Sequence, residues 1–178
     1  EEESDSSHSD TSDFHENFEE GKMNDFSPST AEIYLSCCKN FRTQVVSKVL
    51  HALREDRDNI ELVHGSLRSQ GAICLFEALT RGNSDVQSIV VRDNNIDSQA
   101  APTIANFVKN SKDILSIDIG SNQLGEFRRS LVGALTPLAK SLGEHNRLQS
   151  LCLSRNGFTD SFFTEFSETL VASKNLNL

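Results

Sequence analysis

The stretch VQSIVVRDNNI, residues 86–96, decides the fold because the chain repeats its pattern twice more. Residues 114–124 read ILSIDIGSNQL, and residues 148–158 read LQSLCLSRNGF. In each copy an apolar residue stands at positions 1, 4, 6 and 11, and an asparagine stands at position 9. A weaker copy covers residues 60–67 and carries Gly65 in place of the asparagine. Such repetition is typical of proteins built from similar units stacked side by side.

The centre of each copy predicts a β-strand. Apolar residues at positions 4 and 6 lie on one face of an extended chain, and the residues around them lie on the other. A single unit cannot bury that apolar face, so neighbouring units must stack with their strands parallel. The asparagines Asn94, Asn122 and Asn156 follow the strands where the chain turns. Because a buried amide donates and accepts hydrogen bonds, we expect them to form a structural ladder, imperfect at Gly65.

The three copies resemble the leucine-rich-repeat template LxxLxLxxNxL. The 28-residue spacing from Val86 to Ile114, and the helical sequences at 71–79 and 100–108, resemble repeats of the ribonuclease-inhibitor type. That resemblance covers residues 32–178. It implies an α/β solenoid, a right-handed horseshoe arc with a parallel sheet on its concave face and helices on its convex face. The next spacing is 34 residues, which places a six-residue insertion near 125–132.

We expect three regions along the chain. Residues 1–27 form an acidic tail with nine acidic residues and no Lys or Arg in its first 20 positions, a composition that favours disorder. Residues 28–56 form a helical N-terminal cap, with a capping box at Ser29 and Glu32 and a second helix over 43–54. Residues 57–178 hold four leucine-rich repeats and the start of a fifth at Leu176.

The tail admits two interpretations. It either solubilises the protein or, through Phe14, Phe18 and Phe26 spaced among acidic residues, docks on a partner. At the other end, the aromatic fourth repeat leads us to expect that the natural chain continues beyond Leu178. The alternative is that its C-terminal edge is an interface, for instance for self-association.

Composition excludes several classes of function. The chain has 26 acidic residues, and 17 of them remain once the nine of the tail are set aside. They are matched by 17 basic residues, so the rest of the chain is close to neutral. We therefore expect no binding of nucleic acid. The sequence contains no run of 18 apolar residues, so it predicts no membrane span. The cysteines Cys37, Cys38, Cys74 and Cys152 form no CxxC motif, which indicates reduced thiols in the cytoplasm and no metal site. We expect no cofactor.

We find none of the motifs HExxH, GxSxG, P-loop or GxGxxG, so the sequence predicts a non-enzymatic scaffold or adaptor that binds another protein. The partner is expected on the concave face, where strand residues between the buried apolar positions point outward. These residues are Glu61, Val63, His64, Val90, Arg92, Asp93, Asp118, Ser121, Cys152, Ser154 and Arg155. Cys152 is expected to be accessible there, whereas the histidines are expected to be ordinary surface residues.

Two alternatives remain open. Some repeat proteins of this subtype activate GTPases, for which Arg92 or Arg155 would have to reach a bound nucleotide. The chain also resembles the short repeat domain of actin-capping proteins, although we find no counterpart of that family's C-terminal helix. The opening from Tyr34 to Cys38 and on to Val46 and Leu53 resembles the lead-in of cytoplasmic leucine-rich-repeat proteins of ciliated cells. These resemblances imply a cytoskeletal or ciliary location.

Overall fold

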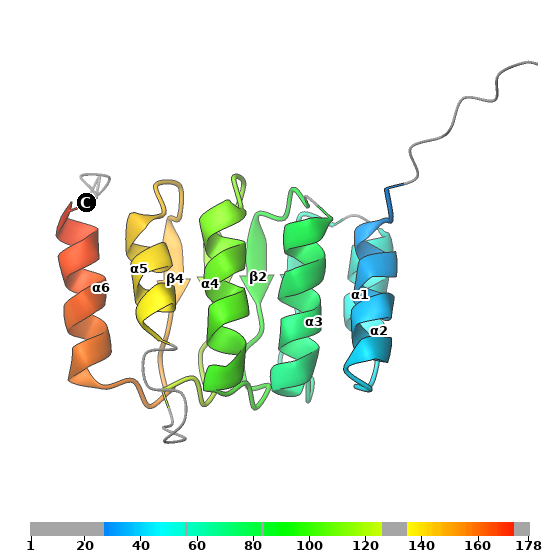
Figure 1. Ribbon diagram of the computed structural model, residues 1–178, viewed down its shortest axis with the longest axis horizontal. Helices are drawn as coiled ribbons and strands as arrows, with labels where there is room; N and C mark the ends of the chain where they lie inside the picture. The colour runs from blue at the N-terminus through cyan, green and yellow to red at the C-terminus, as the bar shows by residue number, and fades with distance from the viewer. Residues whose placement is uncertain (1–26, 56, 83, 126–134, 173–178) are drawn as a thin grey trace, which may run out of the picture.

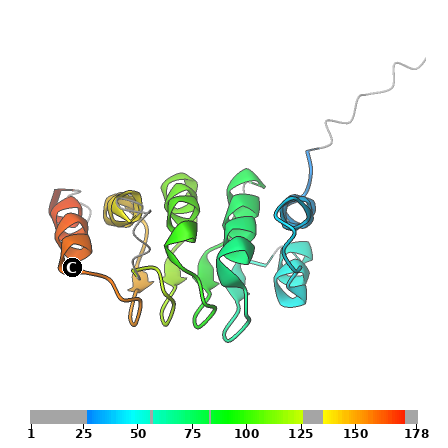
Figure 2. The same ribbon diagram turned by 60° about the horizontal axis from the view of Figure 1, so that its bottom comes forward.

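The computed structural model describes residues 27–55, 57–82, 84–125 and 135–172. The tail up to residue 26, the expected insertion near 125–132 apart from Gly125, and the expected start of a fifth repeat at Leu176 lie outside these ranges. The described residues form a mixed α/β fold in which helices stand in a row beside a parallel sheet (Figures 1 and 2).

The sheet has four strands in the order β1-β2-β3-β4, and all neighbours are parallel. The strands are β1 (Asn59–Glu61), β2 (Ser88–Val90), β3 (Ser116–Asp118) and β4 (Ser150–Cys152). The helices are α1 (Thr30–Asn40), α2 (Ser47–Arg54), α3 (Arg68–Arg81), α4 (Ala101–Asn110), α5 (Thr136–Glu144) and α6 (Asp160–Ala172), and a short 3-10 turn η1 (Ser98–Ala100) precedes α4.

The hydrophobic core lies between the sheet and the helices. Ile60, Ile89, Ile117 and Leu151 occupy the same register position in the four strands, and the first three are buried. Helices α3 to α6 pack in sequence order, and α1 packs on α3. The apolar positions that repeat in the sequence therefore become the continuous interior of the stack.

Helix α1 begins with the predicted capping box. The Ser29 hydroxyl accepts a hydrogen bond from the backbone N–H of Glu32 at 3.3 Å, and the Glu32 carboxylate accepts one from the backbone N–H of Ser29 at 2.9 Å. The bond from the Ser29 backbone lowers the pKa of Glu32. These bonds satisfy amides at a helix start that would otherwise lack partners.

The predicted start of the second helix at Thr43 is wrong, because α2 begins at Ser47. Val46 is extended, with φ −86° and ψ 112°, and its N–H donates to the Tyr34 hydroxyl at 3.1 Å. That tertiary contact holds the residues before Ser47 outside the helix. Local apolar spacing could not reveal it.

Three cysteines lie inside the protein where α1 meets α3. Cys37, Cys38 and Cys74 are all buried. Burial raises the pKa of Cys37 and of Cys74, and it does the same for the neighbouring Tyr34. The folded protein therefore keeps these groups protonated.

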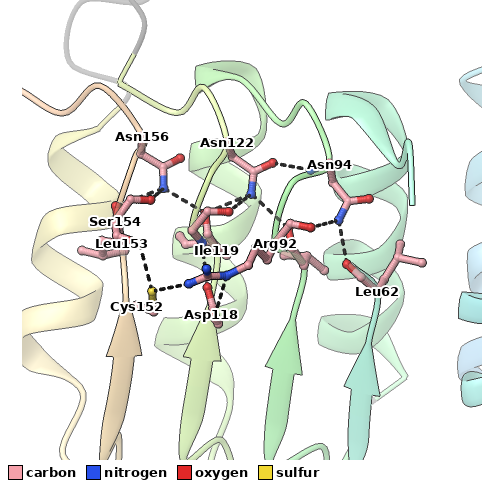
Figure 3. A network of polar contacts seen from close by, with 12 residues as sticks. Leu62, Arg92, Asn94, Asp118, Ile119, Asn122, Cys152, Leu153, Ser154 and Asn156 are labelled. Carbon is pink, nitrogen blue, oxygen red and sulfur yellow. Dashed lines mark hydrogen bonds and ion pairs between the residues drawn. The ribbon is translucent and has the colours of Figure 1, made fainter. Parts of the chain in front are cut away.

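The inward asparagines connect each strand to the turns of its own unit and the unit before it (Figure 3). The Asn122 side-chain oxygen accepts hydrogen bonds from the N–H groups of Asn94 at 3.0 Å and Ile96 at 3.1 Å. Its amide nitrogen donates to the carbonyls of Val91 and Ile119, both at 2.9 Å. Asn122 is buried, so it supplies partners to backbone groups that water does not reach.

Asn94 and Asn156 make equivalent contacts. Asn94 accepts from the N–H groups of Gly65 and Leu67, and Asn156 donates to the carbonyls of Ile119 and Leu153. Gly65 has no side chain to continue the series toward α2, and a Cβ there would lie 2.4 Å from Leu62 Cγ. The ladder therefore begins at Asn94.

The last described unit is less covered than the inner ones. Leu151 and Leu153 are half-buried, whereas their counterparts Ile117 and Ile119 are fully buried. Aromatic residues fill part of this end: Phe158 stacks on Phe162 with ring centroids 4.1 Å apart. Phe163 of α6 is 47% exposed. Strand β4 is the edge of the sheet among the described residues.

We predict that Asn122→Ala lowers the free energy of unfolding by about 1–3 kcal/mol, because it leaves buried backbone donors and acceptors unsatisfied. Chemical denaturation measures the change. Asn106→Ala, at an exposed position on α4, is the matched control and should leave stability nearly unchanged. Equal effects of the two substitutions would contradict the ladder's structural role.

We also predict that stability falls as pH rises above about 9, the ordinary pKa of a cysteine thiol. Cys37 and Cys74 have raised pKa values in the folded protein, so above that pH the unfolded chain releases protons that the folded protein retains. Denaturation at pH 8 and pH 10 measures the loss, which should shrink in Cys74→Ala. An unchanged loss in that variant would exclude Cys74 as a source.

Candidate functional site

One side of the sheet faces away from helices α3 to α6, and we call it the open face (Figure 2). Two rows of side chains cross it in register on either side of the central apolar residues. The first row is Asn59, Ser88, Ser116 and Ser150, and the second is Glu61, Val90, Asp118 and Cys152. Backbone hydrogen bonds continue past the strand ends, so Val63, Arg92, Gly120 and Ser154 form a third row.

Arg92 reaches across two neighbouring strands (Figure 3). Its Nε donates to Asp118 Oδ2 at 3.2 Å, and its Nη2 lies 3.2 Å from Cys152 Sγ. The Cys152 sulfur is in turn 3.3 Å from Ser154 Oγ. Side chains from three successive units therefore form one polar network in the middle of the open face, which we call the Arg92 network.

Gly120 provides the space for this crossing. A Cβ at position 120 would lie 3.2 Å from Arg92 Nη2, 3.2 Å from Ser154 Oγ and 3.0 Å from Asp118 Oδ1. Any larger side chain would stand where the guanidinium passes over β3. The glycine therefore leaves room for the guanidinium, and a side chain there would push Arg92 and its neighbours aside.

Asp118 is held from two directions, because its Oδ1 accepts the N–H of Gly120 at 2.8 Å while Oδ2 faces Arg92. The Arg92 side chain is 39% exposed and that of Asp118 is 23% exposed. The contacts with Cys152 and then Asp118 raise the pKa of Arg92 above its ordinary value, so the guanidinium stays charged. The network presents fixed polar groups to solvent.

The residues just before the asparagine positions share an uncommon backbone conformation. His64, Asp93, Ser121 and Arg155 have φ angles of 55°, 55°, 54° and 54°. This left-handed conformation is uncommon for residues other than glycine, and it turns the chain away from the sheet. His64 Nδ1 contacts Asp93 Oδ2 between adjacent units, and both side chains are exposed.

The structure places all of the predicted site residues on the open face or on the turn beside it. It brings Arg92, Asp118, Cys152 and Ser154 into one network, and it pairs His64 with Asp93. Glu61 on β1 and Arg155 after β4 lie at opposite ends, and neither has an ion-pair partner among the described residues.

Sequence reasoning missed the first row, from Asn59 to Ser150, and it missed Gly120. The sequence did contain a signal for the first row. Side chains alternate between the two faces of a strand, so the residues two positions before Glu61 and Val90 lie on the same face as they do. The role of Gly120 had no such signal, since it depends on the path of Arg92 across the sheet.

His145 is not an ordinary surface residue. It is half-buried, and its Nδ1 accepts the N–H of Leu148 at 3.1 Å while Nε2 lies 3.1 Å from the Ser111 carbonyl. This pattern assigns the proton to Nε2 and makes His145 a link between the segments that precede β3 and β4. The other two described histidines, His51 and His64, are exposed.

Across the four described ranges, no group of three or more His, Cys, Asp or Glu side chains could hold a metal ion. Of the four cysteines, Cys152 alone is not buried. No helix within those ranges is both long enough and apolar enough to cross a membrane.

Comparisons with known proteins place the fold but not a family. No protein-family model and no curated protein matches the sequence. Ten chains of solved structures match. One, described as "Leiomodin-1 Actin-Binding Site 2 (ABS2)", has 16% identity and a TM-score of 0.60, covering 75% of this chain and 76% of that one. The tropomodulin C-terminal domain of Caenorhabditis elegans matches at 14% identity and a TM-score of 0.44, covering 74% and 94%. The leiomodin-1 match shows that the two chains share a fold.

We predict that Gly120→Val displaces Arg92 from Cys152. The Nε–H of Arg92, which is bonded to Asp118, should then exchange faster with water, as measured by NMR of the arginine side chains. Arg147 also contacts a carboxylate, that of Asp113 at 3.1 Å, and serves as the internal control that should not change. Unchanged exchange at Arg92 would show that the guanidinium does not need the space at Gly120.

Proposed function

We propose that this chain is a leucine-rich-repeat protein of the ribonuclease-inhibitor type, an arc-shaped solenoid whose open face is concave. In this proposal it is not an enzyme, and its open face binds another protein. The repeated strand–helix units, the parallel sheet and the inward asparagines support the assignment of fold type. In this proposal α1 and α2 form a helical N-terminal cap, and the repeats follow it along the chain.

The observation that carries the proposed function is the Arg92 network. Its charged and polar groups are already held by one another at the centre of the open face, so a partner has fewer side chains to order when it binds. Around it the face presents both signs of charge, with Glu61 and Asp93 on one side and Arg155 on the other. Mixed charge of this kind fits a protein surface with complementary groups.

Actin is the partner that we propose. The leiomodin-1 structure with the same fold is described as an actin-binding site, which makes a cytoskeletal role the most specific hypothesis to test. A ciliary location is a narrower form of this proposal and rests on the resemblance of the opening from Tyr34 to Leu53. For the GTPase-activating alternative Arg92 is the less favoured candidate, because its guanidinium is occupied by Asp118 and Cys152, which leaves Arg155 as the residue to test.

The test uses the double variant Val90→Glu/Arg92→Glu, which places two negative charges at the centre of the open face. We expect it to weaken binding to actin at least tenfold, about 1.4 kcal/mol, in cosedimentation with filaments and in titration of labelled monomers. The matched control is Lys109→Glu/Lys140→Glu, on exposed positions of α4 and α5, which should bind as the parent does.

The outcomes separate the two parts of the proposal. If the parent chain binds neither form of actin, then actin is the wrong partner. If it binds, and the open-face variant binds equally well while remaining folded, then the open face is the wrong surface.

A further inference from the structure

The N-terminal edge of the sheet carries unpaired backbone groups. The N–H of Leu62 donates to the Val90 carbonyl at 2.7 Å, and the N–H of His64 donates to the Arg92 carbonyl at 3.2 Å. Successive residues of a strand point their backbone groups to opposite sides. The backbone groups of Glu61 and Val63 therefore point away from β2, and they have no hydrogen-bond partner among the described residues. A strand edge of this kind can accept another extended chain.

The surface beside this edge is hollow. A cavity of about 910 Å³ is bounded by Lys48, His51 and Ala52 of α2 and by residues from 57 to 63, including Glu61 and Val63. A second cavity of about 450 Å³ follows at the other end of α2, between residues 42–47 and residues 65–68. The two lie end to end along α2, and together we call them the α2 groove.

The end of the α2 groove near Arg42 is electropositive. Arg42 and Arg68 line the smaller cavity, and among the described residues no Asp or Glu does. Helices α2 and α3 both begin there, and neither has a side-chain cap at its N-cap residue, Val46 or Leu67. The positive ends of both helix dipoles add to the two guanidinium groups. The other end is mixed, with Lys48 and Arg57 opposite Asp58 and Glu61.

We propose that the α2 groove binds the chain's own acidic N-terminal segment, residues 10–20, as an extended strand beside β1. Five of the nine acidic residues of the first 20 positions lie in this segment, which contains no Lys or Arg. Its carboxylates face Arg42 and Arg68, and its backbone pairs with Glu61 and Val63.

The length of the chain permits this docking. Six residues separate Glu20 from Ser27, and extended chain covers about 3.3 Å per residue. Helix α1 has 11 residues, which span about 16 Å, and Arg42 follows its end. The segment therefore reaches the groove without any rearrangement of the helices.

The docking has a consequence for binding at the open face. Glu61 and Val63 belong to that face as well as to the groove, so a bound segment covers its β1 end. The acidic segment then competes with any partner that needs this end. The inference itself does not depend on what the partner is.

The experiment uses the full chain with Phe18→Trp, because the sequence contains no tryptophan and the new side chain reports alone. We expect a blue-shifted emission and protection from acrylamide, relative to the same chain in denaturant. Arg42→Glu/Arg68→Glu should remove both effects, and adding Glu16→Lys, Glu19→Lys and Glu20→Lys to it should restore them. The matched control, Lys109→Glu/Lys140→Glu, changes the net charge equally and should keep them.

Hydrogen exchange gives a second readout on the groove itself. The amides of Glu61 and Val63 should exchange slowly in the full chain and fast in Arg42→Glu/Arg68→Glu. Fast exchange at both amides in the parent, or tryptophan emission that the arginine variant does not change, would overturn the proposal. Protection that vanishes on dilution would also overturn it, because it would place the segment in the groove of a second copy.

Discussion

Asn94, Asn122 and Asn156 stand where each strand turns toward its helix, and the stack depends on their hydrogen bonds. A strand of three residues leaves many backbone groups unpaired at the following turn, inside a protein that excludes water there. Each amide supplies both a donor and an acceptor at that point and connects two neighbouring units. The units can therefore stack at a fixed register, which in turn keeps the central apolar residues in a single continuous core.

The same register creates the open face. Because the strands are parallel and in step, position 92 of one unit, position 120 of the next and position 154 of the third lie in one row. A long side chain in the first unit and a glycine in the second let a guanidinium pass over one strand and contact the next. Arg92 thus shares one network with Asp118, 26 residues later in the sequence, and with Cys152, 60 residues later.

The two ends of the stack are covered by different structures. At the N-terminal end, α1 covers the side of α3, while α2 stands beside the edge of β1 and leaves the groove between them. At the C-terminal end, a cluster of phenylalanines fills the space under α6, and Leu151 and Leu153 remain half-buried. Both ends combine unpaired strand edge with accessible side chains, so both differ from the interior units in how they can meet other chains.

The sequence by itself determined the strand–helix unit, the parallel order, the buried face and the side of the strand on which Glu61, Val90 and Cys152 lie. These features follow from a short periodic pattern, and the pattern carries its own geometry: alternation in strands and 3.6-residue spacing in helices. The capping box at Ser29 and Glu32 is local in the same way.

Tertiary structure alone decided the rest. The start of α2 depends on a hydroxyl 12 residues away, that of Tyr34. The role of His145 depends on the Ser111 carbonyl 34 residues away. The Arg92 network depends on which side chains become neighbours across strands. The α2 groove depends on how α2 packs beside the edge of β1. Each of these is a contact between residues distant in sequence, and no local pattern encodes the distance that will separate them once the chain has folded.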